Sequence, residues 1–307
     1  MRCALFLFAI CAGTALAQAP AGGGMEVVLL GTGFPRPFPD RAGPATAVVV
    51  NGKYFVVDAG RGVVLRLAAV QAPLPPVTAV LLTHLHSDHI SGLPDLFNTG
   101  WVMGRKQPLE LYGPRGSDAL VAGIMKFYKE DIHIRRDLTE TLAPAGARIN
   151  LHIVREGVVY KDADVTITAF AVDHKPVEYA FGYKFEAGGK TIVISGDTGP
   201  SDNLVKFARG ADILVHEVYL PGFFRTHATP TAPGFIDAVH TAAAAERLSR
   251  YHTDAEQVGK IAAQAGVKQL VLTHVIPPEQ SEQIRALAAK SFTGTIVVGN
   301  DLMRFRP

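Results

Sequence analysis

The chain has 307 residues, with 30 basic and 28 acidic side chains, a formal net charge of +2 and two cysteines. A near-balanced charge without a basic tract offers no electrostatic footprint for nucleic acid, so composition argues against a nucleic-acid partner.

Residues 1–17 have the form of a secretory signal peptide: a basic second residue, an apolar core from Ala4 to Ile10, and small residues up to Ala17. The apolar core is too short to span a membrane. Cleavage after Ala17 would remove Cys3 and Cys11, which leaves no disulfide and no thiolate metal ligand. We therefore expect a periplasmic or extracellular protein, with a flexible linker at residues 18–24 and a single domain over residues 25–307.

The domain is expected to begin with a short apolar strand, Met25 to Leu30, that ends in the turn Gly31-Thr32-Gly33. No helix follows this turn, so the two glycines do not indicate a dinucleotide site. A proline-rich loop comes next and carries Arg36 and Arg41. These arginines are either contacts for an anionic substrate or solvated loop charges.

Two further strands, Ala45 to Val50 and Tyr54 to Val57, flank Asn51-Gly52, which is a strong hairpin signal. Asp58 follows the second strand directly. A carboxylate at this position needs partners, and it is either an acceptor for backbone amides or a group that orients a metal-bound histidine. Residues Arg61 to Gln71 are expected to form a helix that ends before a proline-rich stretch.

Four potential metal ligands lie within six residues after the apolar run that ends at Thr83: His84, His86, Asp88 and His89. The apolar run is typical of a buried strand, and open α/β sheets place their sites in the loops after such strands. His84 and His86 point to the same side of an extended loop and can bind one cation, while Asp88 and His89 reach a second.

This His-x-His-x-Asp-His pattern resembles that of the metallo-β-lactamase superfamily. The resemblance implies an α/β (α+β) fold, a four-layer αβ/βα sandwich with two metal ions at one edge. It also requires further ligands downstream.

The elements after this motif alternate between helix and strand as far as residue 128 and then become rich in strands. The expected helices are Ile90 to Val102 and Ser117 to Tyr128, with Ser117 as the cap. The expected strands are Leu109 to Tyr112, Ile149 to Val154, Val158 to Lys161, Val165 to Val172 and Lys190 to Ser195.

Two candidate ligands follow strands of this second half. His174 precedes Pro176 at a strand end, and Asp197 follows the apolar residues 191–194. The glycine before Asp197 allows its carboxylate to approach a site and to bridge two cations. The alternative is that Asp197 only caps the next helix.

The segment from Ser195 to Tyr219 resembles ribonuclease Z and its arylsulfatase-like relatives. The resemblance implies that His252, which precedes a helix from Asp254 to Ala265, is a proton donor and that Glu217 orients it. The alternative for His252 is that it caps or packs. His216 is expected to be structural or to lie behind the ligands, and a helix is expected around residues 238–250 after a loop at residues 221–233.

The resemblance assigns His84, His86, His174 and Asp197 to one cation. It assigns Asp88, His89, Asp197 and His274 to the other, with Asp88 also acting in catalysis; His274 follows the expected strand Gln269 to Thr273, and a last strand covers Thr295 to Val298. This nitrogen and oxygen donor set favours two zinc ions, and manganese or iron would fit the same donors. Two such ions would lower the pKa of a bridging water enough to supply hydroxide near neutral pH.

We expect from these features a secreted hydrolase that cleaves small anionic sulfate or phosphate esters, as the arylsulfatase-like branch does. The segment between His174 and Asp197 is short, whereas tRNA-processing members of the family carry a long arm there, and this favours small substrates over RNA. The alternatives are a phosphodiesterase or ribonuclease Z-like nuclease, a lactonase, and an extracytoplasmic metal-binding protein without turnover. The resemblance also implies a homodimer, by analogy alone.

Overall fold

The computed structural model describes residues 24–72, 74, 77–221, 246 and 249–307, and all structural statements below concern these residues. The expected signal peptide, the linker up to residue 23 and nearly all of the expected helix at residues 238–250 lie outside them. None of the helices in the described part of the chain is long and apolar enough to cross a bilayer.

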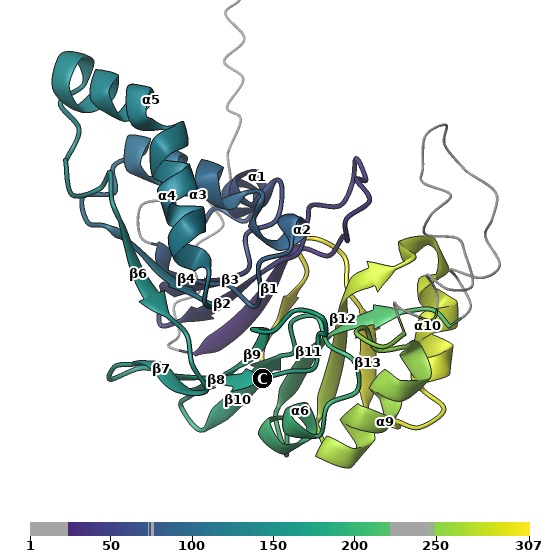
Figure 1. The fold of residues 1–307 in the computed structure, drawn as a ribbon. Helices are drawn as coiled ribbons and strands as arrows, with labels where there is room; N and C mark the ends of the chain where they lie inside the picture. Colours follow the sequence, from purple (N-terminus) through teal and green to yellow (C-terminus); the bar gives the residue numbers. More distant parts are fainter. Residues whose placement is uncertain (1–23, 73, 75–76, 222–245, 247–248) are drawn as a thin grey trace, which may run out of the picture.

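Two seven-stranded sheets form the centre of the molecule (Figure 1). The first has the order β14-β1-β2-β3-β4-β5-β6, and the second β13-β12-β11-β10-β9-β8-β7. The strands of the first sheet are β1 (Met25–Gly31), β2 (Ala45–Val50), β3 (Lys53–Val57), β4 (Val77–Leu81), β5 (Leu109–Gly113), β6 (Ile149–Ile153) and β14 (Arg304–Phe305). Those of the second are β7 (Gly157–Lys161), β8 (Thr166–Ala171), β9 (Phe181–Ala187), β10 (Lys190–Ile194), β11 (Ile213–Tyr219), β12 (Gln269–Ile276) and β13 (Thr295–Val298).

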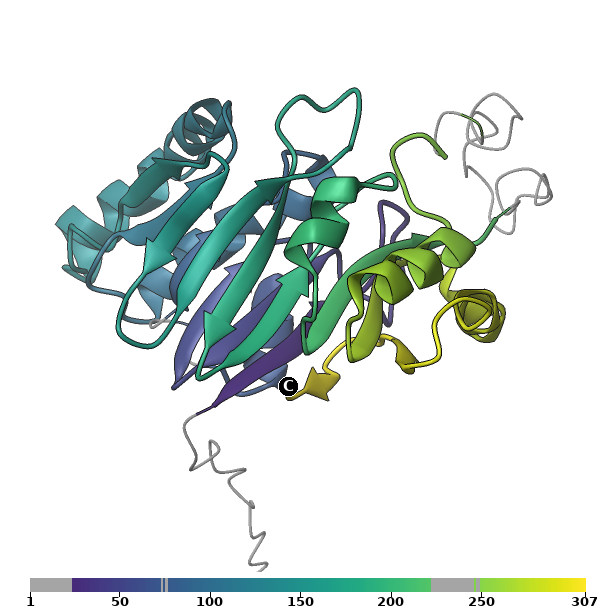
Figure 2. The same cartoon turned by 90° about the horizontal axis from the view of Figure 1, so that it is seen from below.

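Helices cover the outer face of each sheet, as Figure 2 shows from below. On the first sheet these are α1 (Val63–Ala69), α2 (Ser87–Ile90), α3 (Leu93–Val102) and α4 (Ser117–Phe127). The helix α5 (Lys129–His133) and the π-helical turn η1 (Ile134–Thr139) follow α4 and project beyond the sheet (Figure 1). On the second sheet the helices are α6 (Asp202–Phe207), α9 (Ala255–Ala265), α10 (Ser281–Ala288) and the short 3₁₀ turn η3 (Pro278–Gln280). The molecule is therefore the four-layer αβ/βα sandwich expected from the sequence.

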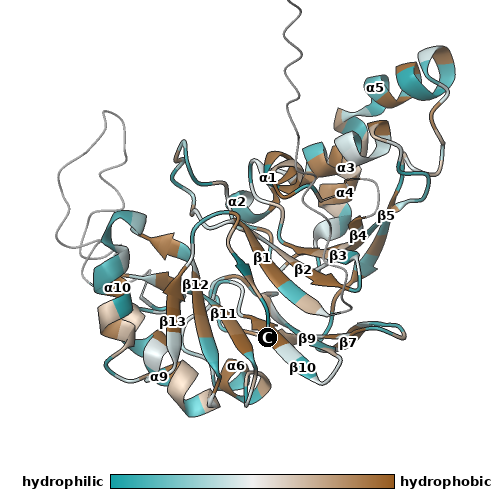
Figure 3. Ribbon diagram, turned by 180° about the vertical axis from the view of Figure 1, so that it is seen from behind, coloured by the Kyte–Doolittle hydropathy of each residue, from teal (hydrophilic) through white to brown (hydrophobic). Residues whose placement is uncertain are grey.

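Three apolar cores hold the layers together. The central core lies between the sheets, where Phe55 of β3 meets Phe185 of β9 with ring centroids 6.1 Å apart. The other two lie between each sheet and its helices, around Trp101 and around Leu214. Because most strands are covered on both faces, they are apolar along much of their length, as the brown strands in Figure 3 show.

Parallel pairing brings several strand ends to one edge of the sandwich. Strands β3 to β6 are parallel in the first sheet, and β10 to β13 are parallel in the second. The loops after β4 and β10, together with the C-terminal part of β12, carry histidines and carboxylates singled out in the sequence. Parallel pairing therefore explains how residues far apart in the chain meet at one edge.

The structure differs from the expected helices at two points. The expected helix from Ile90 to Val102 is broken into α2 and α3 at Ser91 and Gly92. A side chain at Gly92 would meet the Gly60 carbonyl oxygen at 2.2 Å, so close packing, which propensity does not reveal, sets this break. Ser117 does not cap α4; the N-cap is Gly116, in a left-handed conformation with φ 97°.

Candidate metal centre

The first donor group consists of His84, His86, His174 and Asp197, which offer one ligand atom each within 4.8 Å of one another. His84 Nε2 and His174 Nε2 lie 2.9 and 3.2 Å from His86 Nδ1. The loop after β4 supplies two of these residues, the segment between β8 and β9 supplies His174, and the turn after β10 supplies Asp197. Four residues that the sequence singles out separately therefore lie close together in the structure.

The second donor group consists of Asp88, His89 and His274, again with ligand atoms within 4.8 Å of one another. His89 Nε2 and His274 Nε2 lie 3.5 and 3.4 Å from Asp88 Oδ2. His274 lies within β12 and has a left-handed φ of 46°, a conformation uncommon for a residue with a Cβ. This unusual backbone conformation therefore occurs at a residue of the site itself.

Asp197 connects the two groups. Its Oδ2 lies 3.9 Å from His84 Nε2, 3.3 Å from His89 Nε2 and 3.5 Å from His274 Nε2. The alternative of a helix cap does not hold, because Ser201 caps α6 by accepting a hydrogen bond from Leu204 N. A single carboxylate oxygen between two sets of imidazoles is the arrangement that a bridging ligand requires.

The histidines that approach Asp197 are oriented from behind. His84 Nδ1 lies 3.0 Å from the Thr83 hydroxyl, His89 Nδ1 lies 2.8 Å from Asp58 Oδ2, and His174 Nδ1 donates to the Tyr251 carbonyl at 2.8 Å. Such contacts leave Nε2 directed at a common centre, as in known metal sites. His89 Nε2 is fully buried and has no hydrogen-bond partner among the described residues, which fits a ligand atom.

Both alternatives for Asp58 are realised at once. Its Oδ1 accepts the backbone N–H of Thr83 at 2.8 Å, and its Oδ2 accepts the Thr83 hydroxyl at 2.8 Å and faces His89. Thr83 therefore links two ligand-bearing positions, whereas the sequence predicts only a strand end there. Its place between a strand and His84 was the available signal.

Protonation states in the site suit metal binding. Burial and the neighbouring His89 lower the pKa of His84 well below its usual value, and burial also lowers the pKa values of His86 and His174. Burial alone would raise the pKa of Asp197, but the charges of His274 and His89 outweigh it and lower this pKa well below its usual range. Neutral imidazoles beside an ionised carboxylate are the forms that coordinate a divalent cation.

The pKa of His89 shifts in the opposite direction. Burial acts to lower its pKa, but Asp197 and Asp58 outweigh burial and raise the pKa well above its usual value. The two carboxylates thus attract positive charge to this position. A divalent cation would supply positive charge at the same place.

His252 and Glu217 form a buried pair beside the donor groups. His252 Nδ1 lies 3.0 Å from Glu217 Oε1, which also accepts the backbone N–H groups of Thr253 at 3.1 Å and Thr198 at 3.2 Å. Burial would lower the pKa of His252, yet the charge and hydrogen bond of Glu217 raise it to about 9. His252 is therefore held as a cation near neutral pH.

The ring of His252 faces both sets of ligands. It stacks on His274 with centroids 5.7 Å apart and lies edge-on to His174 at 5.2 Å. It does not cap α9, because Asp254 does so by accepting from Gln257 N. The position fits a group that delivers a proton to a molecule bound at the donor groups.

His216 lies outside this cluster. It is fully buried in β11, and its Nδ1 lies 2.6 Å from the Glu217 carbonyl oxygen. Its Nε2 is buried and has no hydrogen-bond partner among the described residues, and the geometry supports a structural place in the strand.

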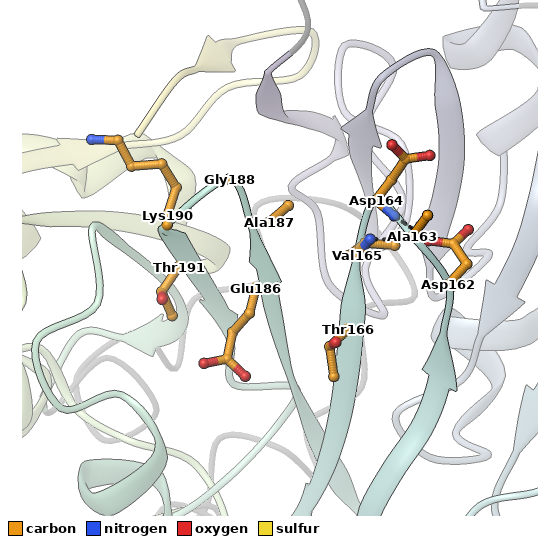
Figure 4. Close-up of a pocket in the computed structure, with 11 residues that line it drawn as sticks. Asp162, Ala163, Asp164, Val165, Thr166, Glu186, Ala187, Gly188, Lys190 and Thr191 are labelled. Carbon is orange, nitrogen blue, oxygen red and sulfur yellow. Dashed lines mark hydrogen bonds between the residues drawn. The ribbon is translucent and has the colours of Figure 1, made fainter.

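A larger hollow lies at the other end of β10 and is separate from this centre. Figure 4 shows it between the turn at Gly188 and the segment from Asp162 to Thr166. Its carboxylates Asp162 and Asp164 are engaged by Lys53 Nζ, and no histidine lines it. A narrow cavity beside the donor groups is lined instead by Asp58, His89, Asp197, Glu217 and His274 among others.

Comparison with known proteins agrees with this geometry. The family model of the beta-lactamase superfamily domain matches residues 53–275. Ribonuclease Z of Mycobacterium bovis (strain BCG / Pasteur 1173P2) is 41% identical over 290 residues, which cover 91% of this chain and 97% of the relative. Ribonuclease Z of Mycobacterium marinum is 39% identical over 286 residues, which cover 91% and 98%.

Solved structures share the fold. The metallo-β-lactamase fold protein YhfI from Bacillus subtilis superposes with a TM-score of 0.70 at 21% identity, covering 92% of this chain and 99% of that one. Human tRNase Z, short form, gives a TM-score of 0.65 at 24% identity, covering 91% and 98%.

The relatives correct one expectation from the sequence. The expectation that nucleic acid is not a partner is wrong, because the relatives that share about two fifths of the sequence are ribonucleases. Balanced net charge was a poor guide, since electrostatic binding depends on where charges lie and not on their sum.

The short segment between His174 and Asp197 does not favour small substrates over RNA either. The alignments cover 97% and 98% of these relatives within 290 and 286 residues, so the relatives have no long extra arm either. The ribonuclease alternative therefore fits the relatives better than the small sulfate esters that were the main expectation.

The extent of the family match, the identity to ribonuclease Z over nine tenths of the chain and the two histidine–aspartate donor groups lead to one conclusion. The chain belongs to the metallo-β-lactamase superfamily of metal-dependent hydrolases and is a homologue of ribonuclease Z.

Proposed function

We propose that the protein is a phosphodiesterase that cleaves RNA in the manner of ribonuclease Z. The observation that carries the proposal is the His252–Glu217 pair beside the bridging position of Asp197. A protein that only stores metal has no need of a buried acid held by a second carboxylate. The names of the relatives support RNA as the substrate class.

The seven donor residues would hold two divalent cations, with zinc favoured by the imidazole-rich set. When bound, the cations supply a nucleophile from water and offset negative charge at phosphorus. His84, His86 and His174 would bind the first with Asp197, and Asp88, His89 and His274 would bind the second with Asp197.

Other residues of the chain orient the metal ligands and supply a proton. Asp58 and the Tyr251 carbonyl keep the imidazoles of His89 and His174 in the orientation that presents Nε2. Glu217 keeps His252 protonated, so that His252 can donate its proton to the leaving oxygen as the phosphorus–oxygen bond breaks. Asp88 contributes as a ligand whose ionised state is favoured, because contacts with His274 and His89 lower its pKa in spite of burial.

The test compares substrates on one preparation of the full chain. It measures cleavage of a 3′-extended precursor tRNA, bis(p-nitrophenyl) phosphate, p-nitrophenyl phosphate, p-nitrophenyl sulfate and a simple lactone, with and without a chelator. We expect metal-dependent cleavage of the RNA and of the phosphodiester, with the sulfate ester the slower substrate. Rapid hydrolysis of the sulfate or the lactone with intact RNA would overturn the proposal.

A matched pair of variants distinguishes RNA cleavage at this site from cleavage by contaminating nucleases. His252→Ala should lose RNA cleavage, and His133→Ala should keep it, because His133 is an exposed histidine on α5 paired with Asp137. Equal activity of the two variants would show that the cleavage comes from elsewhere.

A further inference from the structure

The carboxylate of Asp301 is buried near the end of the chain, where it follows β13 by three residues. Its side chain is 5% exposed. Oδ1 accepts the backbone N–H of Thr32 at 2.9 Å and the Thr32 hydroxyl at 2.8 Å. Oδ2 accepts the backbone N–H of Ala42 at 2.7 Å and pairs with Arg66 Nε at 2.9 Å.

These bonds join both ends of one loop, residues 32–44, to the C-terminal segment. Arg41, in the same loop, donates to the Gly299 carbonyl at 3.1 Å and to the side chain of Asn300. Arg41 also donates to the Thr32 hydroxyl at 2.7 Å. Arg41 is therefore engaged within the fold, which answers the alternative that it is a solvated loop charge.

The same loop lies against the second donor group from two sides. The Thr32 carbonyl accepts the backbone N–H of Val275, the residue after His274, at 3.1 Å. A side chain at Gly43 would come within 3.1 Å of the Asp88 carbonyl oxygen, so the loop backbone is close to Asp88 as well. Pro44 accepts the N–H of Gly60 at 3.0 Å, and the preceding residue, Ala59, donates to the His89 carbonyl at 2.8 Å.

Asp301 itself contacts none of the seven donor residues in the bonds described. Its influence runs through Thr32 to the backbone of His274, whose φ of 46° needs support from its surroundings, and through the loop to Asp88. The path from Asp301 to His84 in the first donor group is longer, because it continues from Gly60 and Ala59 through Asp58 and Thr83.

We propose that Asp301 is a positioning residue for the second metal ion, acting through loop 32–44 on Asp88 and His274. The inference rests on the proposed function in one respect, namely that the two donor groups bind metal. It goes further in assigning to a residue near the C-terminus a selective effect on one ion of the pair.

The experiment measures metal affinity and does not rely on activity. Apo protein of the full chain is titrated with Zn²⁺ against a chromophoric chelator, and the two binding steps are resolved. Asp88→Ala identifies which step belongs to the second donor group. We expect Asp301→Asn to weaken that step by about 10- to 100-fold and to leave the other step within about twofold, the size of effect known for residues behind metal ligands.

Glu26→Gln is the matched control. Glu26 is likewise a buried carboxylate, 9% exposed in its side chain, and it binds two arginines of the C-terminal segment, Arg304 and Arg306. It has no bond to loop 32–44 among the described residues. We expect Glu26→Gln to lower the melting temperature while leaving both metal steps unchanged.

Thr32→Val provides a milder test if Asp301→Asn fails to fold. It removes only the hydroxyl contact with Asp301 and Arg41, and a smaller weakening of the same step is expected. Wild-type affinity at both steps in Asp301→Asn and Thr32→Val, or equal weakening of both steps, would overturn the inference. If the wild-type chain takes up fewer than two ions, the proposed function fails as well, so the two failures are distinguishable.

Discussion

Glu217 Oε1 lies 3.0 Å from Nδ1 of His252, and both side chains are buried beside Asp197. The distance is that of a charge-assisted hydrogen bond, in which the imidazole donates and the carboxylate accepts. The proposed role of His252 as an acid depends on this contact, and so do the first two predictions.

Replacing His252 by alanine should lower turnover of a phosphodiester by about 10²-fold or more, the range expected for loss of a general acid. The bound metal should remain, because the seven residues assigned as donors are unchanged and His252 Nδ1 is instead held by Glu217. Steady-state kinetics and elemental analysis of the same sample check both parts. Loss of metal with the activity would contradict the assignment of His252 as proton donor.

Replacing Glu217 by glutamine should move the alkaline limb of the kcat/KM profile to lower pH. His252 must be protonated to act as an acid, and the pKa of about 9 keeps the proton in place until the pH passes that value. Removing the Glu217 charge lowers this pKa by about one to three pH units. An alkaline limb at the same pH in wild type and variant would show that another group is the acid.

Removing metal should abolish hydrolysis and lower the melting temperature, because ligands that bind the folded state stabilise it by mass action. Adding back two equivalents of Zn²⁺ should restore both. Calorimetry of the apo and reconstituted forms measures the effect, with Mg²⁺ as a control for ionic strength. Full activity in a sample shown to be free of metal would refute the role assigned to the donor groups.

Replacing Asp58 by alanine should weaken metal binding by about 10- to 100-fold, because His89 Nδ1 and Thr83 lose their shared partner. Asp137→Ala removes an exposed carboxylate from an ion pair with Arg136 and should leave metal binding unchanged. Competition with a chelator measures the two variants side by side. Equal affinities would mean that Asp58 does not orient the ligand.

Replacing Gly60 by alanine should disturb the second donor group and destabilise the protein. The added methyl group would lie 2.5 Å from the Asp88 carbonyl oxygen and 2.5 Å from the backbone of Gly43, and neither can move without moving the loop. Gly123→Ala is the control, because nothing lies within 4 Å of its new methyl group and alanine favours helix α4 by roughly 0.5–1 kcal/mol. The melting temperature and the metal content should both fall in Gly60→Ala, and neither should fall in Gly123→Ala.

Much of the architecture could be predicted from local patterns. The hairpin at Asn51-Gly52 and the strands from Met25 and Lys190 follow from turn residues and apolar runs, which act over a few neighbouring positions. The His-x-His-x-Asp-His motif likewise supplies four potential metal ligands within six residues, and these ligands lie in the two donor groups of the structure. The break at Gly92 could not be predicted, because it depends on how closely α2 approaches the backbone of Gly60.

The sequence by itself determined most of the strands and pointed to the candidate donor residues near their ends, because apolar runs, turn residues and ligand chemistry are properties of short segments. Only the tertiary structure decided that Asp197 Oδ2 lies between two sets of imidazoles, that Asp58 serves Thr83 and His89 together, and that Asp301 is bonded to Thr32, 269 positions away. Contacts between residues so far apart in the chain depend on how the two sheets pair and pack, and a local sequence pattern does not specify them.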